Sequence, residues 1–401
     1  MKKNLLFVIP GLGAGGGEKS LVNLLSLIDF NKFNVEIYLL SNEKGLNYHS
    51  LPKEVVHLAL LNDHRIFTSR LLISIIGFIK ARKYKLALTR IMFSVHNRLI
   101  KNNAFAEQQT WKYVSSSIQP LTKKYDVAIG YLEKSSVYFI VDKVCADKKI
   151  GWIHTNYDDS GMNKNYDYPY FKKLNYIVTV SEECAASLIN NFNNLKTRIK
   201  VIYNIVSPSN VLFLARKKTN TTPFESDHIN ILTVARLSYE KGVDIAIESC
   251  HILVKKGYKI VWTVLGEGRE RKKLQELIDN YGLGENFYLL GTKENPYPYF
   301  YDADIYVQPS RYEGKSIAID EAKILKKPIV ITNYNSAKDQ INHGKNGLIV
   351  DVGKDGIAKG IENMISDNKQ RDFFIKNLSQ ETLGTETEIT KLYQLIDNGN
   401  V

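Results

Sequence analysis

Short apolar runs, separated by segments with helical spacing, recur along the whole chain and constrain its fold more than any other feature. Seven such runs precede residue 205, at residues 4–9, 33–40, 55–60, 127–131, 150–154, 177–181 and 199–203. Six follow it, at residues 229–235, 260–265, 287–290, 305–307, 329–331 and 348–350. Alternation of strands with helices is typical of parallel α/β sheets. With 401 residues, the chain is long enough to form two α/β domains with full cores.

The positive charge is confined to the N-terminal half. Residues 1–205 hold 28 Lys and Arg against 16 Asp and Glu, whereas residues 206–401 hold 26 of each. Between residues 64 and 101 there are nine cations and no acid; the cations are Arg65, Arg70, Lys80, Arg82, Lys83, Lys85, Arg90, Arg98 and Lys101. Apolar residues in this segment recur at helical spacing, which predicts two amphipathic helices, around residues 71–79 and 88–99.

Amphipathic helices rich in Lys and Arg favour an anionic membrane surface as a partner. The alternative is that the apolar faces belong to the core and the charges form an ordinary solvated face. Nucleic acid is the other polyanion to consider, but no nucleic-acid-binding motif accompanies the charge. We therefore predict that residues 64–101 bind a membrane and that the protein does not bind nucleic acid.

The cysteines and the apolar segments indicate the cellular compartment of the protein. Cys145, Cys184 and Cys250 lie far apart, without the paired spacing of a zinc site or a disulfide framework, which fits a reducing cytosol. The apolar run at residues 5–9 is too short for a signal peptide and is interpreted as the first strand. The longest apolar run, residues 71–79, is about half of what a membrane span needs. We expect a cytoplasmic protein, peripheral at the inner face of the cell membrane.

The segment from Ser310 to Lys323 carries the first indication of chemistry. A strand pattern at residues 305–307 leads into a tight loop, and a helical pattern begins near Ser316. Glu313 lies in the loop and Glu321 in the first turns of the helix. The N-terminus of a helix carries unpaired N–H groups and a partial positive charge, which suit phosphate. A carboxylate beside it can accept both hydroxyls of a ribose, so the pattern indicates a nucleotide that bears a sugar.

Glu313 and Glu321, with Gly directly after the first and Ala directly after the second, resemble the retaining glycosyltransferases of family four. The resemblance implies the GT-B fold, in which two Rossmann-like parallel-sheet domains face each other across a cleft. Residues 201–206 resemble the crossover between these domains. We accordingly expect an acceptor-side domain at residues 1–204, a nucleotide-sugar-binding domain at 205–380, and a C-terminal helix in 381–401 that packs back towards the N-domain.

The resemblance also assigns the donor-binding residues. Arg236 and Lys241 bracket a loop after the strand at residues 229–235, where two cations can converge on one diphosphate. They match the family's pair that neutralises the donor pyrophosphate. The family's position near the hydroxymethyl group of the donor sugar corresponds to His154. The remaining assigned residues contact the donor mainly through backbone groups and are Gly15, Gly16, Thr292, Lys293, Gly314, Lys315 and Ser316.

Lys315 and Ser316 depart from the family pattern, which often has apolar or small residues here. A lysine at this position can reach a diphosphate or an acidic sugar, so the identity of the transferred sugar is not inferred from the family. Two other motifs are excluded. The Walker A glycine expected at position 309 is Pro309, and the Asp302-Ala303-Asp304 sequence precedes a strand where metal carboxylates would follow one. We expect neither a metal nor another cofactor.

These observations predict a retaining transfer of a sugar from a nucleoside diphosphate, expected to be UDP, to a hydroxyl of a lipid-linked or oligosaccharide acceptor in bacterial surface-polysaccharide synthesis. Glu313 and His154 are the predicted catalytic residues, and Glu321 is expected to hold the ribose. One alternative is a nucleotide-sugar epimerase or phosphorylase of the same architecture. Others are an NAD-dependent oxidoreductase, through Gly11, Gly13 and Gly16 in a G-x-G-x-x-G pattern, and a non-catalytic membrane-surface binder.

Overall fold

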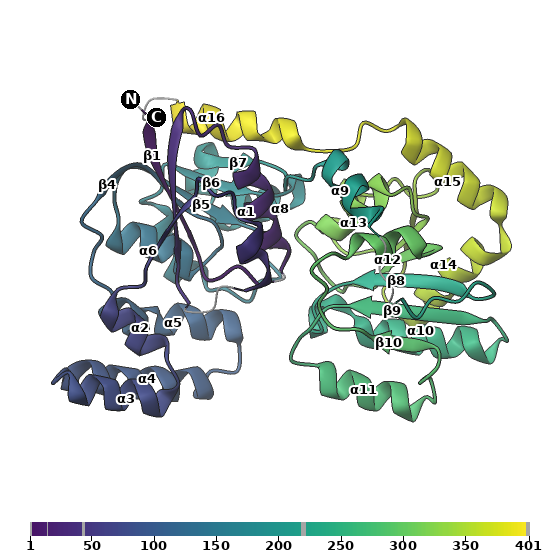
Figure 1. Ribbon diagram of the computed structural model, residues 1–401, viewed down its shortest axis with the longest axis horizontal. Helices are drawn as coiled ribbons and strands as arrows, with labels where there is room; N and C mark the ends of the chain where they lie inside the picture. Colours follow the sequence, from purple (N-terminus) through teal and green to yellow (C-terminus); the bar gives the residue numbers. More distant parts are fainter. Residues whose placement is uncertain (1, 14, 42–44, 218–221, 398–401) are drawn as a thin grey trace. The chain divides into compact units, whose positions relative to one another are not determined.

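The structure is a computed structural model that describes residues 2–13, 15–41, 45–217 and 222–397. It divides into two compact units (Figure 1). The first comprises the chain up to Asn204 together with the segment from Thr387 onwards, and the second runs from Ile205 to Glu386. Each unit contains one parallel β-sheet with helices packed against it.

The sheet of the first unit has the strand order β3-β2-β1-β4-β5-β6-β7, and its neighbouring strands are all parallel. Its strands are β1 (Lys3–Ile9), β2 (Phe33–Leu39), β3 (Val56–Leu58), β4 (Lys124–Gly130), β5 (Cys145–Ile153), β6 (Tyr176–Thr179) and β7 (Ile199–Val201). Its helices are α1 (Gly16–Ser26), α2 (Asn62–Thr68), α3 (Leu71–Lys80), α4 (Tyr84–Leu99), α5 (Asn103–Ser116), α6 (Ser135–Lys143), α7 (Lys164–Phe171), α8 (Glu182–Asn191) and α16 (Ile389–Asp397).

The sheet of the second unit has the order β10-β9-β8-β11-β12-β13 and is parallel as well. Its strands are β8 (Ile229–Val234), β9 (Ile260–Leu265), β10 (Phe287–Leu289), β11 (Ile305–Gln308), β12 (Ile329–Thr332) and β13 (Leu348–Val350). Its helices are α9 (Pro208–Ala215), α10 (Val243–Lys255), α11 (Arg271–Asn280), α12 (Tyr297–Asp302), α13 (Ile317–Ile324), α14 (Lys354–Ser366) and α15 (Asn368–Gln380).

Both faces of the second sheet are buried. Ile305 and Val307 of β11 pack into one core with α10, α11 and α14, whereas Tyr306 packs into the opposite core with α9, α12 and α13. Successive side chains of a strand point to opposite faces, so a strand covered on both faces has to be apolar throughout. This explains why these strands are continuous apolar runs in the sequence. The prediction of two parallel-sheet α/β domains is confirmed.

The sequence has helical spacing from residue 368 to about 398, with a C-terminal helix expected in 381–401, but the chain is not helical throughout this range. The chain forms α15, leaves the helix after Gln380, and begins α16 only at Ile389. Gly384 adopts a left-handed φ of +111°, and a Cβ there would lie 2.7 Å from Pro208 Cδ. Thr385 N donates to the Val206 carbonyl at 3.1 Å. Residues 381–386 therefore belong to the second unit and do not begin the final helix.

Helix α16 packs on the first unit. Tyr393 OH accepts from Asp29 N at 2.9 Å, and the Tyr393 ring packs on Phe33 with centroids 5.3 Å apart. Lys148 Nζ donates to the Ile396 carbonyl at 2.8 Å. These contacts tie residues 389–397 to the N-terminal ends of the strands around β1.

Helices α3 and α4 form where the two amphipathic helices were predicted, and they pack against each other and against α2 and α5. Arg90 is not on their solvated face. It is buried, and its guanidinium donates to the backbone carbonyls of Phe67 at 2.8 Å and Ser69 at 3.2 Å. In the described part of the chain, no helix combines the length and apolarity that a membrane span requires.

Candidate functional site

Two loops at the carboxyl ends of neighbouring strands build the site in the second unit. Strands β8 and β11 pair directly, so the loops that follow them, residues 235–242 and 309–316, lie side by side. Gly242 has a φ of +64°, and a Cβ on it would lie 2.0 Å from the Pro309 carbonyl oxygen. Only glycine permits this contact, because any side chain would push the loops apart.

Arg311 joins the same two loops by several contacts. Its guanidinium donates to both carboxylate oxygens of Asp244, at 2.8 and 2.7 Å, and to the Tyr239 carbonyl at 2.7 Å. The Arg311 backbone N–H donates to the Glu240 carbonyl at 2.8 Å. A bidentate Arg–carboxylate pair fixes orientation as well as distance. The loops are thus held as one rigid platform.

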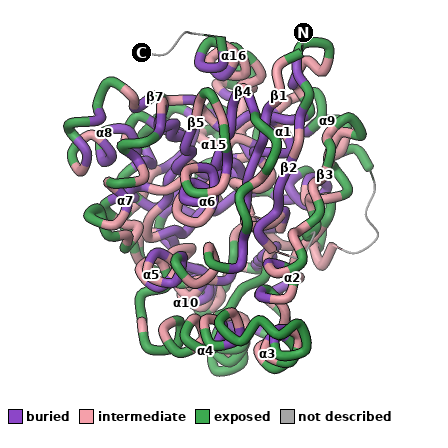
Figure 2. The backbone as a smooth tube through the Cα atoms, turned by 90° about the vertical axis from the view of Figure 1, so that its left-hand side faces the viewer, coloured by how far each residue is buried: buried purple, intermediate pink, exposed green. Residues whose placement is uncertain are grey.

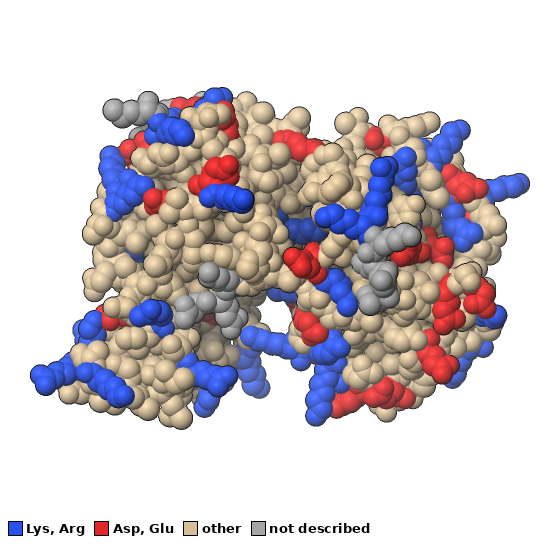
Figure 3. All heavy atoms as spheres, viewed as in Figure 1, with Lys and Arg blue, Asp and Glu red and all other residues tan. Residues whose placement is uncertain are grey.

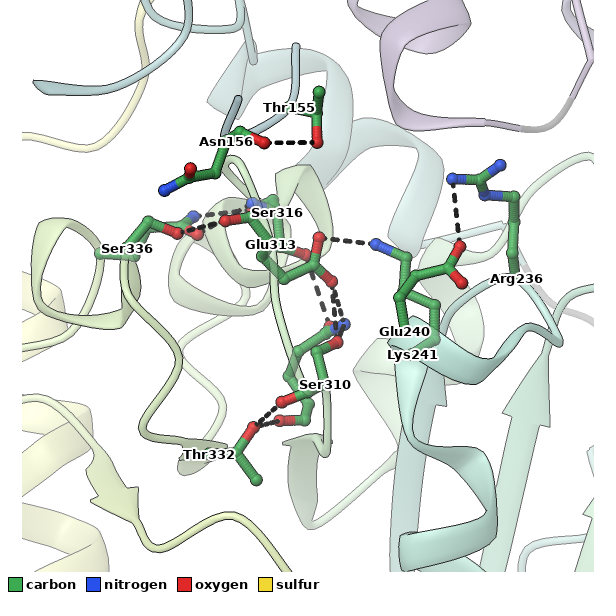
Figure 4. Close-up of polar contacts among 12 residues, drawn as sticks. Thr155, Asn156, Arg236, Glu240, Lys241, Ser310, Glu313, Ser316, Thr332 and Ser336 are labelled. Atoms are coloured by element: carbon green, nitrogen blue, oxygen red, sulfur yellow. Dashed lines mark hydrogen bonds and ion pairs between the residues drawn. The ribbon is translucent and has the colours of Figure 1, made fainter. Parts of the chain in front are cut away.

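Glu313 lies at the centre of this platform, with only 8% of its surface exposed. Its Oε2 accepts from Lys241 Nζ at 2.6 Å (Figure 4). Its Oε1 accepts from Gln308 Nε2 at 3.0 Å and from Ser310 Oγ at 2.8 Å. Ser336 Oγ donates to the Glu313 backbone carbonyl at 2.8 Å. The carboxylate is therefore fixed by three donors, one of which is a cation.

The two predicted cations do not meet. Lys241 lies against Glu313, whereas the Arg236 side chain is 65% exposed and, among the described residues, pairs with Glu240, with Nη2 and Oε1 3.7 Å apart. Figure 4 shows Arg236 beside Glu240, apart from the Lys241–Glu313 pair. The backbone around Arg236 is fixed, because the Arg236 carbonyl accepts from Ser238 N at 3.0 Å and Leu237 N donates to the Glu267 carbonyl at 3.0 Å. The structure thus places one of the two cations at the carboxylate and leaves the other at the surface.

Helix α13 begins at Ile317 and carries Glu321, which is 2% exposed and accepts from Tyr297 OH at 3.0 Å. Ser316 is the N-cap, and its backbone N–H donates to Gln340 Oε1 at 2.9 Å. The side chain of Ser316 does not cap the helix within the described residues. Anion binding by the first N–H groups of α13 stays a prediction.

Gly314 and Lys315 complete the loop before α13. The Gly314 backbone is buried. The Lys315 side chain is only 8% exposed and lies with Nζ 4.0 Å from Asp320 Oδ2. Burial raises the pKa of Asp320, whereas the nearby Lys315 lowers it. The positive charge of Lys315 is thus directed to a carboxylate of its own unit.

Thr292 and Lys293 follow β10 at the same edge of the sheet. Gly291 has a φ of +72°, and its carbonyl accepts from Gly266 N at 3.0 Å, which joins this loop to the one after β9. Thr292 and Lys293 are half-buried, and Lys293 Nζ lies 5.9 Å from the centroid of the Tyr299 ring. These residues belong to the same unit as Glu313, but they follow β10, which β9 and β8 separate from β11.

The other predicted residues, Gly15, Gly16 and His154, belong to the first unit. Gly15 is the N-cap of α1, and Gly16 is its first residue. A Cβ on the next residue, Gly17, would lie 3.7 Å from His154 Nδ1. His154 N donates to Glu133 Oε2 at 3.1 Å. The His154 Nε2 atom is buried and has no hydrogen-bond partner among the described residues.

The pKa of His154 is lowered to about 4, mainly by burial, and burial likewise lowers the pKa of His64 to about 4. Both imidazoles are therefore neutral at pH 7, and His154 can donate or accept one hydrogen bond there without carrying charge.

These two pKa values predict that the first unit loses stability in mild acid. An unfolded histidine binds a proton below about pH 6.5, whereas the folded one resists until about pH 4, so stability falls as pH drops through this window. Between pH 7 and pH 5 each histidine is expected to lower the free energy of unfolding by about 2 kcal/mol. Urea denaturation of wild type and His64→Asn at both pH values measures the difference, and the exposed His343→Asn is the control. An equal pH dependence in all three proteins would contradict it.

Sequence reasoning missed the residues that support the site. Gln308 and Ser310 follow the strand pattern and carry no sign of a role in the sequence, although they hold the Glu313 carboxylate. Arg311, Asp244 and Gln340 carried no signal, because their partners lie between 24 and 72 residues away. The only hint was Gly242, since a glycine directly before a helix can mark a close approach of the backbone.

The chain is similar to a known protein family and to several known proteins. Residues 216–381 match the family model described as glycosyl transferases group 1. A poly(ribitol-phosphate) alpha-N-acetylglucosaminyltransferase of Staphylococcus aureus is 27% identical over 204 residues, which are 49% of this chain and 38% of the relative. The N-acetylgalactosamine-N,N'-diacetylbacillosaminyl-diphospho-undecaprenol 4-alpha-N-acetylgalactosaminyltransferase of Campylobacter jejuni is 23% identical over 377 residues, 92% of each chain.

The chain spans about half the length of several other curated relatives that it matches. Among solved structures, Anabaena HepE in complex with UDP and glucose superposes with a TM-score of 0.69 and 15% identity, over 99% of this chain and 100% of the other. At this identity the likeness concerns the fold, and it confirms the two-domain GT-B class.

Proposed function

Because residues 216–381 match the family model of the group 1 glycosyl transferases, we propose that the protein transfers a sugar from a UDP-sugar to a hydroxyl group of an acceptor, with retention of the anomeric configuration. The observation that carries the proposal is the buried Lys241–Glu313 pair on a rigid platform at the carboxyl ends of β8 and β11. Ligands of parallel α/β sheets bind at this edge. A paired charge, held in place before any ligand arrives, is what electrostatic catalysis needs.

Each residue has a distinct task in this reaction. Lys241, Arg236 and the first N–H groups of α13 neutralise the diphosphate as it departs. Lys241 then contacts both the leaving diphosphate and Glu313. The Glu313 carboxylate stabilises the positive charge that develops on the sugar. Glu321 accepts hydrogen bonds from the ribose hydroxyls, and the hydrogen bond that it accepts from Tyr297 OH weakens when the donor binds. His154 donates to the donor sugar as a neutral imidazole.

Retention is proposed to arise by attack of the acceptor on the face that the diphosphate leaves. The acceptor oxygen forms the new bond to the anomeric carbon while the carbon–oxygen bond to the diphosphate breaks, and a diphosphate oxygen takes the acceptor proton. This path is favoured over a covalent intermediate on Glu313, because both oxygens of that carboxylate already accept strong hydrogen bonds. A carboxylate bound in this way is a weaker nucleophile.

The acceptor is proposed to be a lipid-linked or oligosaccharide chain of a bacterial surface polysaccharide. The support comes from the names of the relatives, one of which acts on a diphospho-undecaprenol-linked glycan and another on poly(ribitol-phosphate). We propose that the reaction is cytoplasmic, which fits the three free cysteines. We also propose that it needs no metal, because Lys241 and the N-terminus of α13 supply the positive charge, and activity in excess EDTA tests this point.

Donor binding is tested by thermal shift with UDP and a panel of UDP-sugars. A ligand that binds only the folded state stabilises it by about 2.7 kcal/mol at one hundred times its Kd. We expect UDP to raise the Tm of wild type, and Glu321→Gln to weaken UDP binding about 10-fold, because an amide cannot accept both ribose hydroxyls. The exposed Glu276→Gln serves as the control. The proposal fails if no UDP-sugar shifts the Tm, or if no sugar is transferred to an acceptor from the panel.

A further inference from the structure

Helices α3 and α4 turn apolar side chains outward. Of the 18 exposed large apolar side chains in the described chain, ten lie on these two helices, although the helices make up only a small part of it. The ten, called here the apolar stripes, are Leu72, Ile73, Ile76, Ile79, Tyr84, Leu88, Ile91, Met92, Val95 and Leu99. Leu72 and Leu99 are more than 70% exposed. Figure 2 shows α3 and α4 together at one end of the first unit, with most of their length exposed.

The inward faces of the same helices are already occupied. Ser74 and Phe78 of α3 and Ala87 and Arg90 of α4 are buried, and Phe67, Phe78 and Ala87 form a small core of their own. Arg90 ties α4 to the end of α2 through backbone carbonyls. The apolar stripes are therefore a second apolar face, and the core of the unit does not use it.

A basic rim surrounds the apolar stripes. Its eight exposed cations are Arg65, Arg70, Lys80, Arg82, Lys83, Lys85, Arg98 and Lys101. Asp63 at the edge of this segment is bound by Lys83, with Nζ and Oδ1 2.5 Å apart. Figure 3 shows Lys and Arg side chains around an otherwise uncharged surface over α3 and α4. The rim thus carries an excess of positive charge that its own acids do not neutralise.

We propose that the apolar stripes and the basic rim form a docking surface for an anionic phospholipid membrane, with the stripes in the interfacial layer and the rim at the lipid phosphates. Exposed apolar faces larger than a few side chains mark interaction sites, and a basic amphipathic face fits an anionic bilayer. A second copy of this chain would bring two basic rims together, and they would repel. Nucleic acid would satisfy the rim but leave ten apolar side chains in water. The inference goes beyond the proposed function and does not depend on it.

Vesicle sedimentation tests the surface. Wild type is expected to bind vesicles of phosphatidylglycerol and phosphatidylcholine, to bind pure phosphatidylcholine weakly, and to lose affinity in 0.5 M salt, a concentration chosen to be about three times physiological. The rim variant Lys80→Gln/Lys85→Gln/Arg98→Gln should lower the partition coefficient about 100-fold, since each cation contributes about fivefold. The stripe variant Leu72→Ser/Ile76→Ser/Leu88→Ser should lower it at least about 10-fold.

Matched controls lie in the second unit. Lys255→Gln/Lys272→Gln/Lys273→Gln removes three exposed charges, and Phe213→Ser/Tyr301→Ser/Phe373→Ser removes three exposed rings. Both are expected to bind vesicles within about twofold of wild type. Circular dichroism and the thermal shift with UDP show that each variant is folded, and they separate failure of this inference from failure of the donor site.

Insertion has its own signature. A tryptophan introduced by Leu88→Trp should be quenched by brominated lipid, whereas one introduced by Phe213→Trp should not. Wild-type affinity in both the rim and the stripe variant would overturn the proposal. So would a wild-type oligomer, measured by sedimentation equilibrium, that the stripe variant converts to a monomer while vesicle binding stays absent.

Discussion

Glu313→Gln is expected to lower kcat about 1,000-fold while the affinity for UDP stays close to that of wild type. The substitution keeps the shape of the side chain and removes its charge. Oε1 can still accept from Gln308 and Ser310, but the new amide then faces Lys241 Nζ, and two donors meet where an ion pair stood. The charge that the transition state needs is lost, whereas the diphosphate and ribose contacts remain. Single-turnover kinetics with a saturating UDP-sugar measures the effect.

Stability has to be measured beside the rate, because the Lys241–Glu313 pair is buried, with 17% and 6% of the two side chains exposed. Removing one partner of a buried pair costs about 3 kcal/mol, so the assay temperature has to lie below the Tm of the variant. Glu276→Gln makes the same chemical change on an exposed face of α11 and should leave both rate and Tm unchanged. Turnover of Glu313→Gln within about tenfold of wild type would remove Glu313 from the catalytic residues.

The strands could be predicted because burial on both faces requires every residue of a strand to be apolar. Ile305, Tyr306 and Val307 are all apolar, since one face of β11 meets α10 and the other meets α13. The end of a long helix has a weaker signal in the sequence. Nothing in the helical spacing of residues 368–398 shows that Gly384 packs against Pro208, because that contact joins segments more than 170 residues apart.

The amphipathic pattern of α3 and α4 shows the limit of periodicity most clearly. Spacing predicts that Leu72, Ile76 and Leu88 share faces with their apolar neighbours, but not whether such a face is turned inward or outward. The structure turns it outward and directs Arg90 inward. An arginine with carbonyl partners can be buried, and a leucine can be left exposed where a partner outside the chain covers it.

The same limit applies to the site. A strand followed by a loop and a helix indicates where Glu313 lies, and the resemblance assigns its role, but the partners of its carboxylate depend on how two loops meet. Gly242 and Arg311 hold the two loops together. Gly242 allows a close approach of the backbones, and Arg311 forms a bidentate ion pair. Arg236 and Lys241 are indistinguishable as cations in the sequence, yet the meeting of the loops brings only Lys241 to Glu313.

This difference predicts that the two cations contribute unequally. Lys241→Met should lower kcat/KM for the UDP-sugar about 1,000-fold, because a buried, pre-positioned charge acts on the leaving diphosphate without reorganisation. Arg236→Met should lower it only about 10-fold, since that guanidinium is largely exposed and screened by water, and it has to leave Glu240 before it can bind the donor. Methionine keeps the apolar length of each side chain, and Lys272→Met on the exposed face of α11 is the control.

A double-variant cycle shows whether Lys241 acts with Glu313 or beside it. If the pair works as one unit, Lys241→Met combined with Glu313→Gln should be little slower than either single variant, because the first substitution already removes what the second would remove. Independent roles would instead multiply the two losses to about a millionfold, below the rate that single-turnover kinetics can follow. Equal losses for Arg236→Met and Lys241→Met would contradict the geometry, since they would require Arg236 to be as well positioned as a lysine held 2.6 Å from its carboxylate.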